Sequence, residues 1–311
     1  MTRRRAFAGI VVVVALIALA LPKIIFPLVA IDVLCFALFA LALDLLFGFI
    51  GLLSFGQAMF WGGSGYVAAI LVQRGHVDAV LAIALAVAYA TALALVVGVI
   101  SVRRSGIYFA MITLAIAQIE YFVAVQLTPL TGGENGFPID TRGLFFGVPM
   151  ENDVAFYFAV LGIVAVCTFL AFRLVNSPFG FVLSAIAQNE QRAIALGYRV
   201  HRYKLVVFVV AGAVSGLAGA LFSLGNHLAG LEMLDWHTSG IVVMMTILGG
   251  ASTLIGPMIG AAIYQNLSYF VSKTAIGGAT DLVMGLIFGI CVLTFRRGVA
   301  GSILAWRKTS T

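Results

Sequence analysis

The sequence predicts an all-α protein that crosses a membrane about ten times, and three observations favour this fold class. First, 62% of the 311 residues are hydrophobic and only 10% are charged, whereas soluble domains carry about 25% charged residues. Second, apolar residues form runs of roughly 20, the length of a helix that spans a bilayer. Third, Lys and Arg are concentrated between alternate runs. We expect eight to ten spans within one transmembrane domain over residues 1–311.

The first half of the chain contains five apolar runs. Residues 6–21 follow the basic start MTRRR, and we interpret them as an uncleaved first helix, with a signal peptide as the alternative. The other runs cover residues 26–47, 48–72, 79–102 and 107–127. The run at 48–72 is rich in Gly, which weakens a helix and permits close backbone contact, so a broken or re-entrant segment is the alternative to a third span.

The second half gives five more runs, at residues 154–172, 205–228, 240–254, 255–271 and 282–295. The short strings GYVAAI at 65–70 and GAAIY at 260–264 resemble each other, and each follows a Gly-rich break. Two five-helix halves have opposite topologies, as in transporters built from inverted repeats. We therefore expect two inverted five-helix repeats as one arrangement of the spans.

The basic residues predict the orientation of the chain. With the N-terminus inside, all but four of the 18 Lys and Arg fall on the inner side, and the outer loops hold only Lys23, Arg74, Arg142 and Lys273. Inner loops of membrane proteins carry an excess of Lys and Arg, so the net charge of +6 needs no nucleic acid to explain it. We expect both termini to be cytoplasmic, with an outer loop at 128–153, an inner loop at 174–204 and an inner tail at 297–311.

One stretch between two spans is too polar to cross the bilayer. Residues 174–204 contain Glu190 and Arg192, and placing these charges at the bilayer centre costs several kcal/mol. Ser177, which a proline follows, is typical of a helix start, and Gly197 is typical of a helix stop. The residues near one face of such a helix are Leu183, Ile186, Ile194 and Gly197. We predict a helix at the inner surface on which a soluble partner can push, with an ordinary interfacial loop as the alternative.

Few polar residues lie inside the spans. Our candidates for lining a path through the membrane are Ser54, Gln57, Thr113, Gln118 and Glu120. An ionisable group within a span is a functional candidate, with a hydrogen bond to a neighbouring helix as the alternative. The 3 cysteines lie far apart, which argues against a disulfide framework or a metal site. No Gly-Lys pair occurs, so the phosphate-binding loop of P-loop ATPases is absent, and we expect no cofactor on this chain.

Several stretches together resemble the permease subunits of branched-chain amino acid ABC importers. They are DLLFGFIGLLSFGQAMFWGGSGYVAAIL (44–71), YFAMITLAIAQIE (108–120), TGGENG (131–136), the segment 177–204, and TILGGASTLIGPMIGAAI (246–263). Asp44 stands where the family more often has Asn, and Ser252 stands where a Gly is expected. The long TGG loop and the SPFG start are more similar to the second, M-type permease of such importers.

The resemblance implies a bacterial inner-membrane permease subunit without enzymatic activity of its own. Its partners would be a paralogous permease, two cytoplasmic ATPases that use ATP and Mg²⁺, a periplasmic solute-binding protein and the lipid bilayer. The loop at 128–153 would be periplasmic, with its motif at Thr131, Gly132, Gly133, Asn135 and Gly136. ATP binding would close the ATPase dimer and thereby drive alternate access of the pathway.

The resemblance also implies that the inner segment is the coupling loop, whose short helix docks on an ATPase. The docking residues would be Gln188, Asn189, Glu190, Arg192, Ala193 and Gly197. We expect Glu190 to pair with a basic ATPase residue and Ala193 to allow close approach.

Two other functions stay open at this point. A pentose or nucleoside permease of the same superfamily would share the coupling helix. A secondary transporter coupled to an ion gradient could have the same inverted repeats, but it would usually have more ionisable groups within its spans. The solute is also open among branched-chain amino acids, other amino acids, amides and urea, because the binding protein largely selects it.

Overall fold

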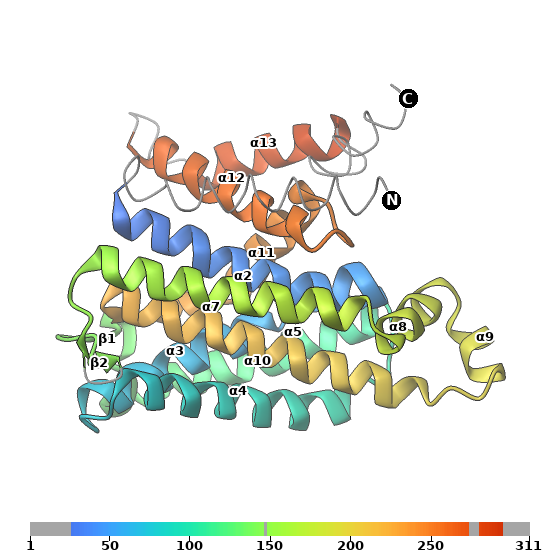
Figure 1. Ribbon diagram of the computed structural model, residues 1–311, viewed down its shortest axis with the longest axis horizontal. Helices are drawn as coiled ribbons and strands as arrows, with labels where there is room; N and C mark the ends of the chain where they lie inside the picture. The colour runs from blue at the N-terminus through green and yellow to red at the C-terminus, as the bar shows by residue number, and fades with distance from the viewer. Residues whose placement is uncertain (1–25, 146–147, 274–279, 295–311) are drawn as a thin grey trace.

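The computed structural model describes residues 26–145, 148–273 and 280–294, and in these ranges the chain is an all-α bundle (Figure 1). Five of the described helices are long and apolar enough to cross a membrane: α2 (Pro27–Ile50), α4 (Ala79–Ser101), α5 (Ile107–Gln126), α7 (Asp153–Val175) and α10 (Val200–Asn226). The predicted class, a helical protein with several spans, is confirmed. The total of ten spans stays a prediction, and the run at 6–21 and the tail at 297–311 lie outside the described residues.

Helix α2 forms the centre of the bundle. It is apolar on all sides, and such a helix is buried on all sides. It contacts α7, α10, α11 (Trp236–Gly249) and α12 (Ile255–Ser272). Phe39 of α2 stacks on Trp61 of the next helix, α3 (Gln57–Gln73), with 4.5 Å between the ring centroids. Close packing of this kind holds membrane helices together. The hydrophobic effect contributes little there, because lipid tails are as apolar as the side chains.

The Gly-rich run at 48–72 is a broken segment and not a single span. Helix α2 ends at Ile50, and Gly51 adopts a left-handed conformation with φ +76° that closes it. Residues 51–56 are not helical, and α3 then begins at Gln57. With 17 residues, α3 is about 26 Å long, somewhat shorter than the bilayer core of about 30 Å. The alternative that the sequence left open is therefore the observed one.

The end of the chain also differs from its predicted spans. The run at 240–254 corresponds to α11, whose 14 residues give a length of about 21 Å, too short to cross the bilayer core alone. A loop at 250–254 then leads to α12, and α13 (Thr280–Thr294) follows. Helices α11 and α12 cross closely, since a Cβ on Gly249 would lie 1.8 Å from the carbonyl oxygen of Gly256.

The helix contacts pair the two halves of the chain. Helices α2 and α10 pack against each other; α2 also contacts α11 and α12, while α10 contacts α3 and α4. This pattern makes α2 equivalent to α10, α3 to α11, α4 to α12 and α5 to α13. Two repeats in the chain would give equivalent helices in this order. The pattern differs from the match between residues 65–70 and 260–264, which would pair α3 with α12. Short strings of small apolar residues recur by chance, and that match was misleading. The opposite direction of the repeats stays a prediction.

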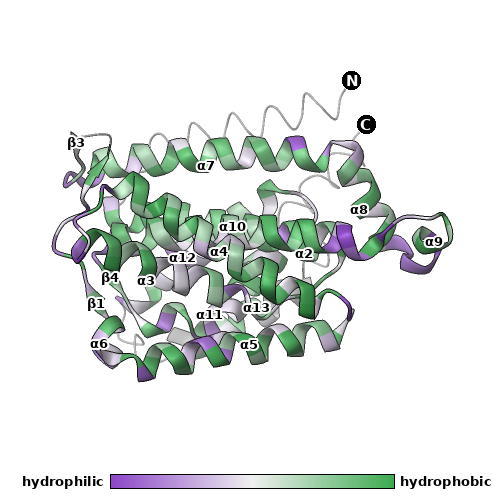
Figure 2. Cartoon of the chain, turned by 90° about the horizontal axis from the view of Figure 1, so that it is seen from below, coloured by the Kyte–Doolittle hydropathy of each residue, from purple (hydrophilic) through white to green (hydrophobic). Residues whose placement is uncertain are grey.

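The polar parts of the chain gather at the two ends of the bundle, with apolar helices between them (Figure 2). One end carries the loop after α5, with α6 (Thr128–Thr131), η1 (Gly133–Asn135), β1 (Phe137–Pro138), β2 (Leu144–Phe145) and β3 (Val148–Pro149). Strand β1 pairs antiparallel with β4 (Leu228–Ala229), which η2 (Leu231–Met233) follows, and β2 pairs with β3. The other end carries α8 (Pro178–Gln188) and α9 (Glu190–Ala195).

Candidate functional site

The inner segment contains two short helices and not one. The predicted start is confirmed, because the Ser177 hydroxyl accepts a hydrogen bond from the Gly180 N–H at 3.4 Å. The helix breaks at Asn189, whose side-chain oxygen accepts the Arg192 N–H at 2.9 Å and so caps α9. Asn is among the residues most favoured at this position. Gly197 has φ +87°, as expected for the residue that closes the segment.

The break changes which residues of the segment face the protein. Leu183 and Ile186 of α8 are buried, as the predicted face requires. Ile194 of α9 is 48% exposed, and Gly197 is exposed too. A continuous helix would have placed all four near one face. The kink at Asn189 rotates the second half away from it.

A partly buried ion pair ties α9 to the first turns of α10. The Lys204 amine lies 2.7 Å from a carboxylate oxygen of Glu190, and the Lys204 side chain is almost completely buried. Ala193 is buried within the chain as well. Within this chain Glu190 thus binds Lys204 and Ala193 packs inside, while their expected contacts with an ATPase stay predictions.

The exposed residues of the segment are partly apolar. Gln188, Asn189 and Arg192 are exposed, and Leu196 beside them is 72% exposed. An apolar side chain that is exposed at a polar end of a membrane protein is available to a protein partner. Next to it lies a hollow of about 470 Å³, lined by Phe179, Gly197, Tyr198, Arg199, Arg202, Tyr203 and Val206.

Three of the five pathway candidates are completely buried inside this one chain. Ser54 accepts the Gly56 N–H at 3.3 Å, and Gln57 accepts the Ser215 hydroxyl of α10 at 2.8 Å. Thr113 donates to backbone carbonyl groups within its own helix, α5. Of these bonds, that of Gln57 with Ser215 joins two helices, α3 and α10, and the Gln57 amide nitrogen keeps no partner among the described residues.

The other two candidates lie further along α5. Glu120 accepts a hydrogen bond from the Tyr89 hydroxyl of α4 at 2.6 Å, and its second carboxylate oxygen is buried without a partner. The Gln118 amide nitrogen is also buried without a partner. Gly63 of α3 leaves space for the Glu120 carboxylate, because a Cβ atom at position 63 would lie 2.4 Å from one of its oxygens. The structure thus separates the five candidates into two groups and does not bring them to one site.

The loop motif TGGENG is a compact turn. Gly132, Gly133 and Gly136 all have positive φ angles, a conformation that glycine adopts without strain. The Thr131 hydroxyl donates to the Ala124 carbonyl oxygen at 2.7 Å and so fastens the turn to the end of α5. Only Asn135 of the five predicted motif residues is classed as exposed.

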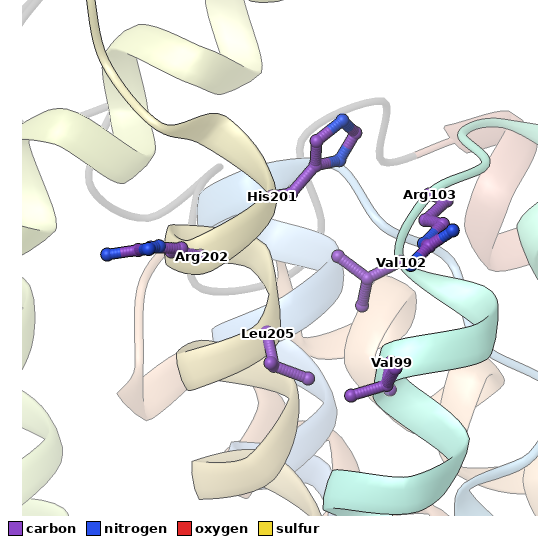
Figure 3. A pocket seen from close by; sticks show the side chains of 7 residues that line it. Val99, Val102, Arg103, His201, Arg202 and Leu205 are labelled. Carbon is purple, nitrogen blue, oxygen red and sulfur yellow. The ribbon is translucent and has the colours of Figure 1, made fainter.

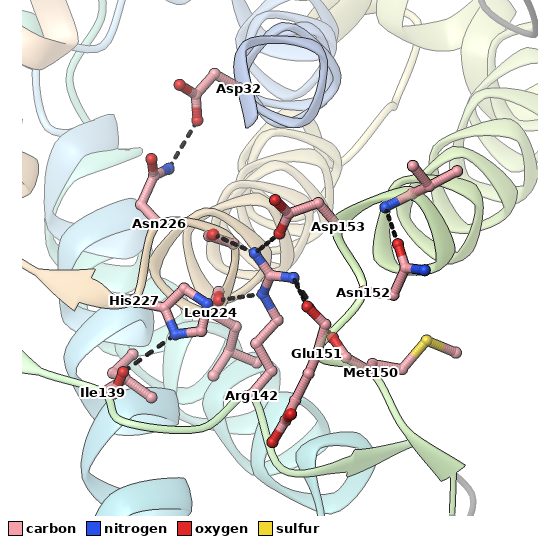
Figure 4. Close-up of polar contacts among 12 residues, drawn as sticks. Asp32, Ile139, Arg142, Met150, Glu151, Asn152, Asp153, Leu224, Asn226 and His227 are labelled. Atoms are coloured by element: carbon pink, nitrogen blue, oxygen red, sulfur yellow. Dashed lines mark hydrogen bonds and ion pairs between the residues drawn. The ribbon is translucent and has the colours of Figure 1, made fainter. Parts of the chain in front are cut away.

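Arg142 holds this loop to α10, a role that the sequence did not indicate (Figure 4). Its guanidinium is completely buried, lies 2.6 Å from a carboxylate oxygen of Asp153 and stacks over the Phe156 ring at 4.8 Å. It also donates to the carbonyl oxygens of Leu224 and Gly225, in the last turn of α10. A cation is favourable there because the carbonyl groups at a helix C-terminus carry partial negative charge.

The two departures from the family pattern touch each other. The Asp44 carboxylate accepts the backbone N–H groups of Ser252 at 2.7 Å and Leu254 at 3.1 Å. The Ser252 hydroxyl donates to the Gly48 carbonyl oxygen at 2.6 Å. Ser252 has φ +66°, a region where glycine is usual, and these bonds offset the strain of the larger residue. Asp44 therefore positions the loop between α11 and α12.

Comparison with known proteins gives related permeases. The family model described as branched-chain amino acid transport system / permease component matches residues 26–294. The chain is 25% identical over 281 residues to the high-affinity branched-chain amino acid transport system permease protein LivM of Escherichia coli (strain K12), covering 83% of this chain and 65% of that relative. It is 30% identical over 178 residues to the ribose import permease protein RbsC of Bacillus subtilis (strain 168), covering 54% of this chain and 52% of that relative.

A third relative, the L-arabinose ABC transporter permease protein AraH of Azospirillum brasilense, is 30% identical over 211 residues, covering 64% of this chain and 58% of that relative. The chain thus spans about two thirds or less of the length of these relatives. No solved structure shows a significant match to it. The family model covers almost all of the described residues, from α2 to α13. The chain belongs to the family of permease components of branched-chain amino acid transport systems.

Proposed function

We propose that this chain is the membrane-spanning permease subunit of an ATP-binding-cassette importer for branched-chain amino acids in the inner membrane. The observation that carries the proposal is the family match over residues 26–294, which includes the polar segment α8–α9 at one end of the bundle. The solute would arrive on a periplasmic binding protein, and separate ATPase subunits would supply ATP hydrolysis. A paralogous permease would complete the membrane part.

The α8–α9 segment supports the coupling role. A soluble ATPase needs a rigid projection to push, and α9 is capped by Asn189, closed at Gly197 and pinned to α10 through Glu190 and Lys204. The docking surface is then the exposed side of the segment, with Arg192 and Leu196, and not the buried residues that hold it.

The buried polar residues support a path along α5 and not through the centre of this chain. Ser54, Gln57 and Thr113 have no exposed surface and serve helix packing. Gln118 and Glu120, unlike Gln57, are partly exposed, and each also has a polar atom without a partner; a polar solute or a neighbouring permease subunit can bind there.

The ribose and arabinose relatives favour a second candidate, a permease for a pentose. Two of them are 30% identical to this chain, against 25% for the branched-chain amino acid relative, although over shorter stretches. The coupling segment would act in the same way for either solute, because the binding protein largely selects what is carried.

Uptake by the reconstituted complex distinguishes these functions. The full chain, with its paralogous permease, ATPases and binding protein, is placed in liposomes, and uptake of labelled leucine, isoleucine, valine, ribose and arabinose is measured. We expect uptake of the three amino acids that requires ATP and Mg²⁺ on the ATPase side. Uptake of pentoses alone would support the second candidate. Uptake driven by an ion gradient, without ATPase subunits, would contradict both.

A further inference from the structure

A second hollow lies at the same end of the bundle, between the last turn of α4 and the first turn of α10 (Figure 3). It has a volume of about 490 Å³ and is lined by Gly98, Val99, Val102, Arg103, His201, Arg202 and Leu205. The side chains of Val99, Val102 and Leu205 lie in the space between the two helices, with His201 and Arg103 at its outer edge. The hollow therefore has an apolar floor and a basic edge.

The apolar floor continues along the side of the bundle. On α4, Val96, Val99 and Ile100 are between 49% and 60% exposed, and on α10 Val206 is 46% exposed. Both helices belong to the group that is long and apolar enough to cross a membrane, so these exposed apolar side chains are suited to contact with lipid tails. The hollow thus lies where an apolar span ends and basic residues begin, which is the depth of lipid headgroups.

The charge at the edge is not neutralised within the chain. Among the described residues, neither Arg103 nor Arg202 forms an ion pair, and Glu190, the acidic residue nearest to Arg202 in the sequence, is bound to Lys204. Arg104 and Arg199 are exposed beside them and also form no ion pair there. Such a cluster attracts an anionic group, and guanidinium groups match the geometry of phosphate.

We propose that this hollow is a binding site for an anionic phospholipid, with one acyl chain over Val99 and Leu205 and the headgroup phosphate at Arg103 and His201. A phospholipid is the occupant that fits both parts, since an acidic segment of a protein would leave the lipid-facing apolar floor unused. The Arg202 side chain points away from this hollow (Figure 3), and Arg202 also lines the hollow beside α9, so the two hollows adjoin at this residue. This site does not depend on which solute is carried.

Lipid binding to matched variants tests the proposal. The full chain, with the subunits that co-purify, is stripped of lipid in a neutral detergent and titrated with phosphatidylglycerol or phosphatidylcholine. Bound lipid is counted by native mass spectrometry. We expect tighter binding of phosphatidylglycerol and, for Arg103→Gln, a loss of affinity of about 5-fold, because one cation near a membrane surface contributes about 1 kcal/mol. Arg104→Gln removes the same charge from the next residue, which does not line the hollow, and should lose clearly less affinity than Arg103→Gln.

The filled variant Val99→Trp is a second check, because it keeps every charge and blocks the apolar floor. It should weaken phosphatidylglycerol binding as well. Equal loss in Arg103→Gln and Arg104→Gln would show a diffuse charge effect and overturn the site. So would unchanged binding in Val99→Trp, equal binding of phosphatidylcholine, displacement of the lipid by inorganic phosphate at equal concentration, or occupation of the hollow by a co-purifying subunit.

Discussion

Arg142 and Asp44 are charged side chains without exposed surface, and both act on backbone groups far away in the sequence. Arg142 donates to carbonyl groups at the end of α10, and Asp44 accepts N–H groups from the loop before α12. Burying such a charge costs several kcal/mol unless hydrogen bonds replace its water. Each residue therefore fixes one connection of the bundle and is intolerant of substitution.

Replacing Arg142 by methionine tests this role. Arg142→Met leaves the carbonyl groups of Leu224 and Gly225 without their donor, and a buried acceptor left unsatisfied costs about 1–3 kcal/mol. We expect the thermal unfolding midpoint in detergent, followed by tryptophan fluorescence, to fall by at least about 5 °C.

Arg74→Met is the matched control, because Arg74 is exposed and donates to a single carbonyl group, that of Pro129. Arg74→Met should lower the unfolding midpoint by no more than about a third of the fall in Arg142→Met, because one hydrogen bond contributes about 1 kcal/mol. An equal fall in both variants would contradict the anchoring role of Arg142.

At this scale the sequence predicted local geometry well and long-range contacts poorly. Ser177 as a cap and Gly197 as a stop follow from the preferences of single residues, and both are confirmed. The contact of Asp44 with Ser252 joins residues 208 positions apart, and nothing in either neighbourhood indicates it. The same holds for Arg142, which the sequence marked only as an outer cation.

At the scale of elements, the α8–α9 segment is a preformed projection. Its two helices are held by a cap at Asn189 and by the ion pair of Glu190 with Lys204, so little order has to be gained when a partner binds. A binding element that is already rigid loses less entropy on association. The continuous helix of the sequence prediction was wrong because the cap preference of Asn189 outweighs the apolar period around it.

Proteolysis measures how firmly the ion pair holds this segment. Glu190→Gln leaves Lys204 buried without a counter-charge, which we expect to favour opening by about 1–2 kcal/mol, or 5- to 30-fold. Under limiting trypsin, cleavage at Arg192 and Arg199 should accelerate to that extent, while cleavage in the loop after Arg104 serves as the internal control.

The double variant Glu190→Gln/Lys204→Met removes the unpaired charge together with its partner. Cleavage should return towards the parent rate, because replacing both members of a buried pair is much less harmful than removing one. Cleavage of the double variant at the rate of Glu190→Gln or faster would rule out the ion pair as the holding contact.

At the scale of the whole molecule, the two polar ends give the bundle a direction. The end with α8 and α9 carries Arg103, Arg104, Arg173, Arg192, Arg199 and Arg202, whereas exposed acidic residues gather at the end with β1 and β4, among them Glu134, Asp140, Glu151 and Glu232. From the positive-inside rule we predict that the first end is cytoplasmic.

Cysteine labelling tests this orientation. Asn135→Cys and Gln191→Cys place one exposed thiol at each end, in a parent whose Cys35, Cys167 and Cys291 are replaced by alanine. A membrane-impermeant maleimide should label Asn135→Cys in intact cells, and should label Gln191→Cys only after the cells are permeabilised. The reverse pattern would invert the proposed topology, and labelling of both in intact cells would contradict a membrane between them.

The sequence predicted the class of the molecule because composition and span length are summed over many residues. It was less accurate for segments such as α3 and α11, whose lengths depend on breaks at Gly51 and Gly250. Glycine permits a helix break without requiring it. The sequence therefore indicates where a break can occur but not whether it does. The pairing of the two halves appeared only in the helix contacts.

Helix α10 connects the two polar ends of the bundle. Its last turn holds Arg142 and, through β4, strand β1 of the loop, while its first turns hold Lys204 and thereby α9. Its 27 residues make an unbroken rod of about 40 Å. One continuous helix therefore joins the loop held by Arg142 at one end of the bundle to the α8–α9 segment held by Lys204 at the other.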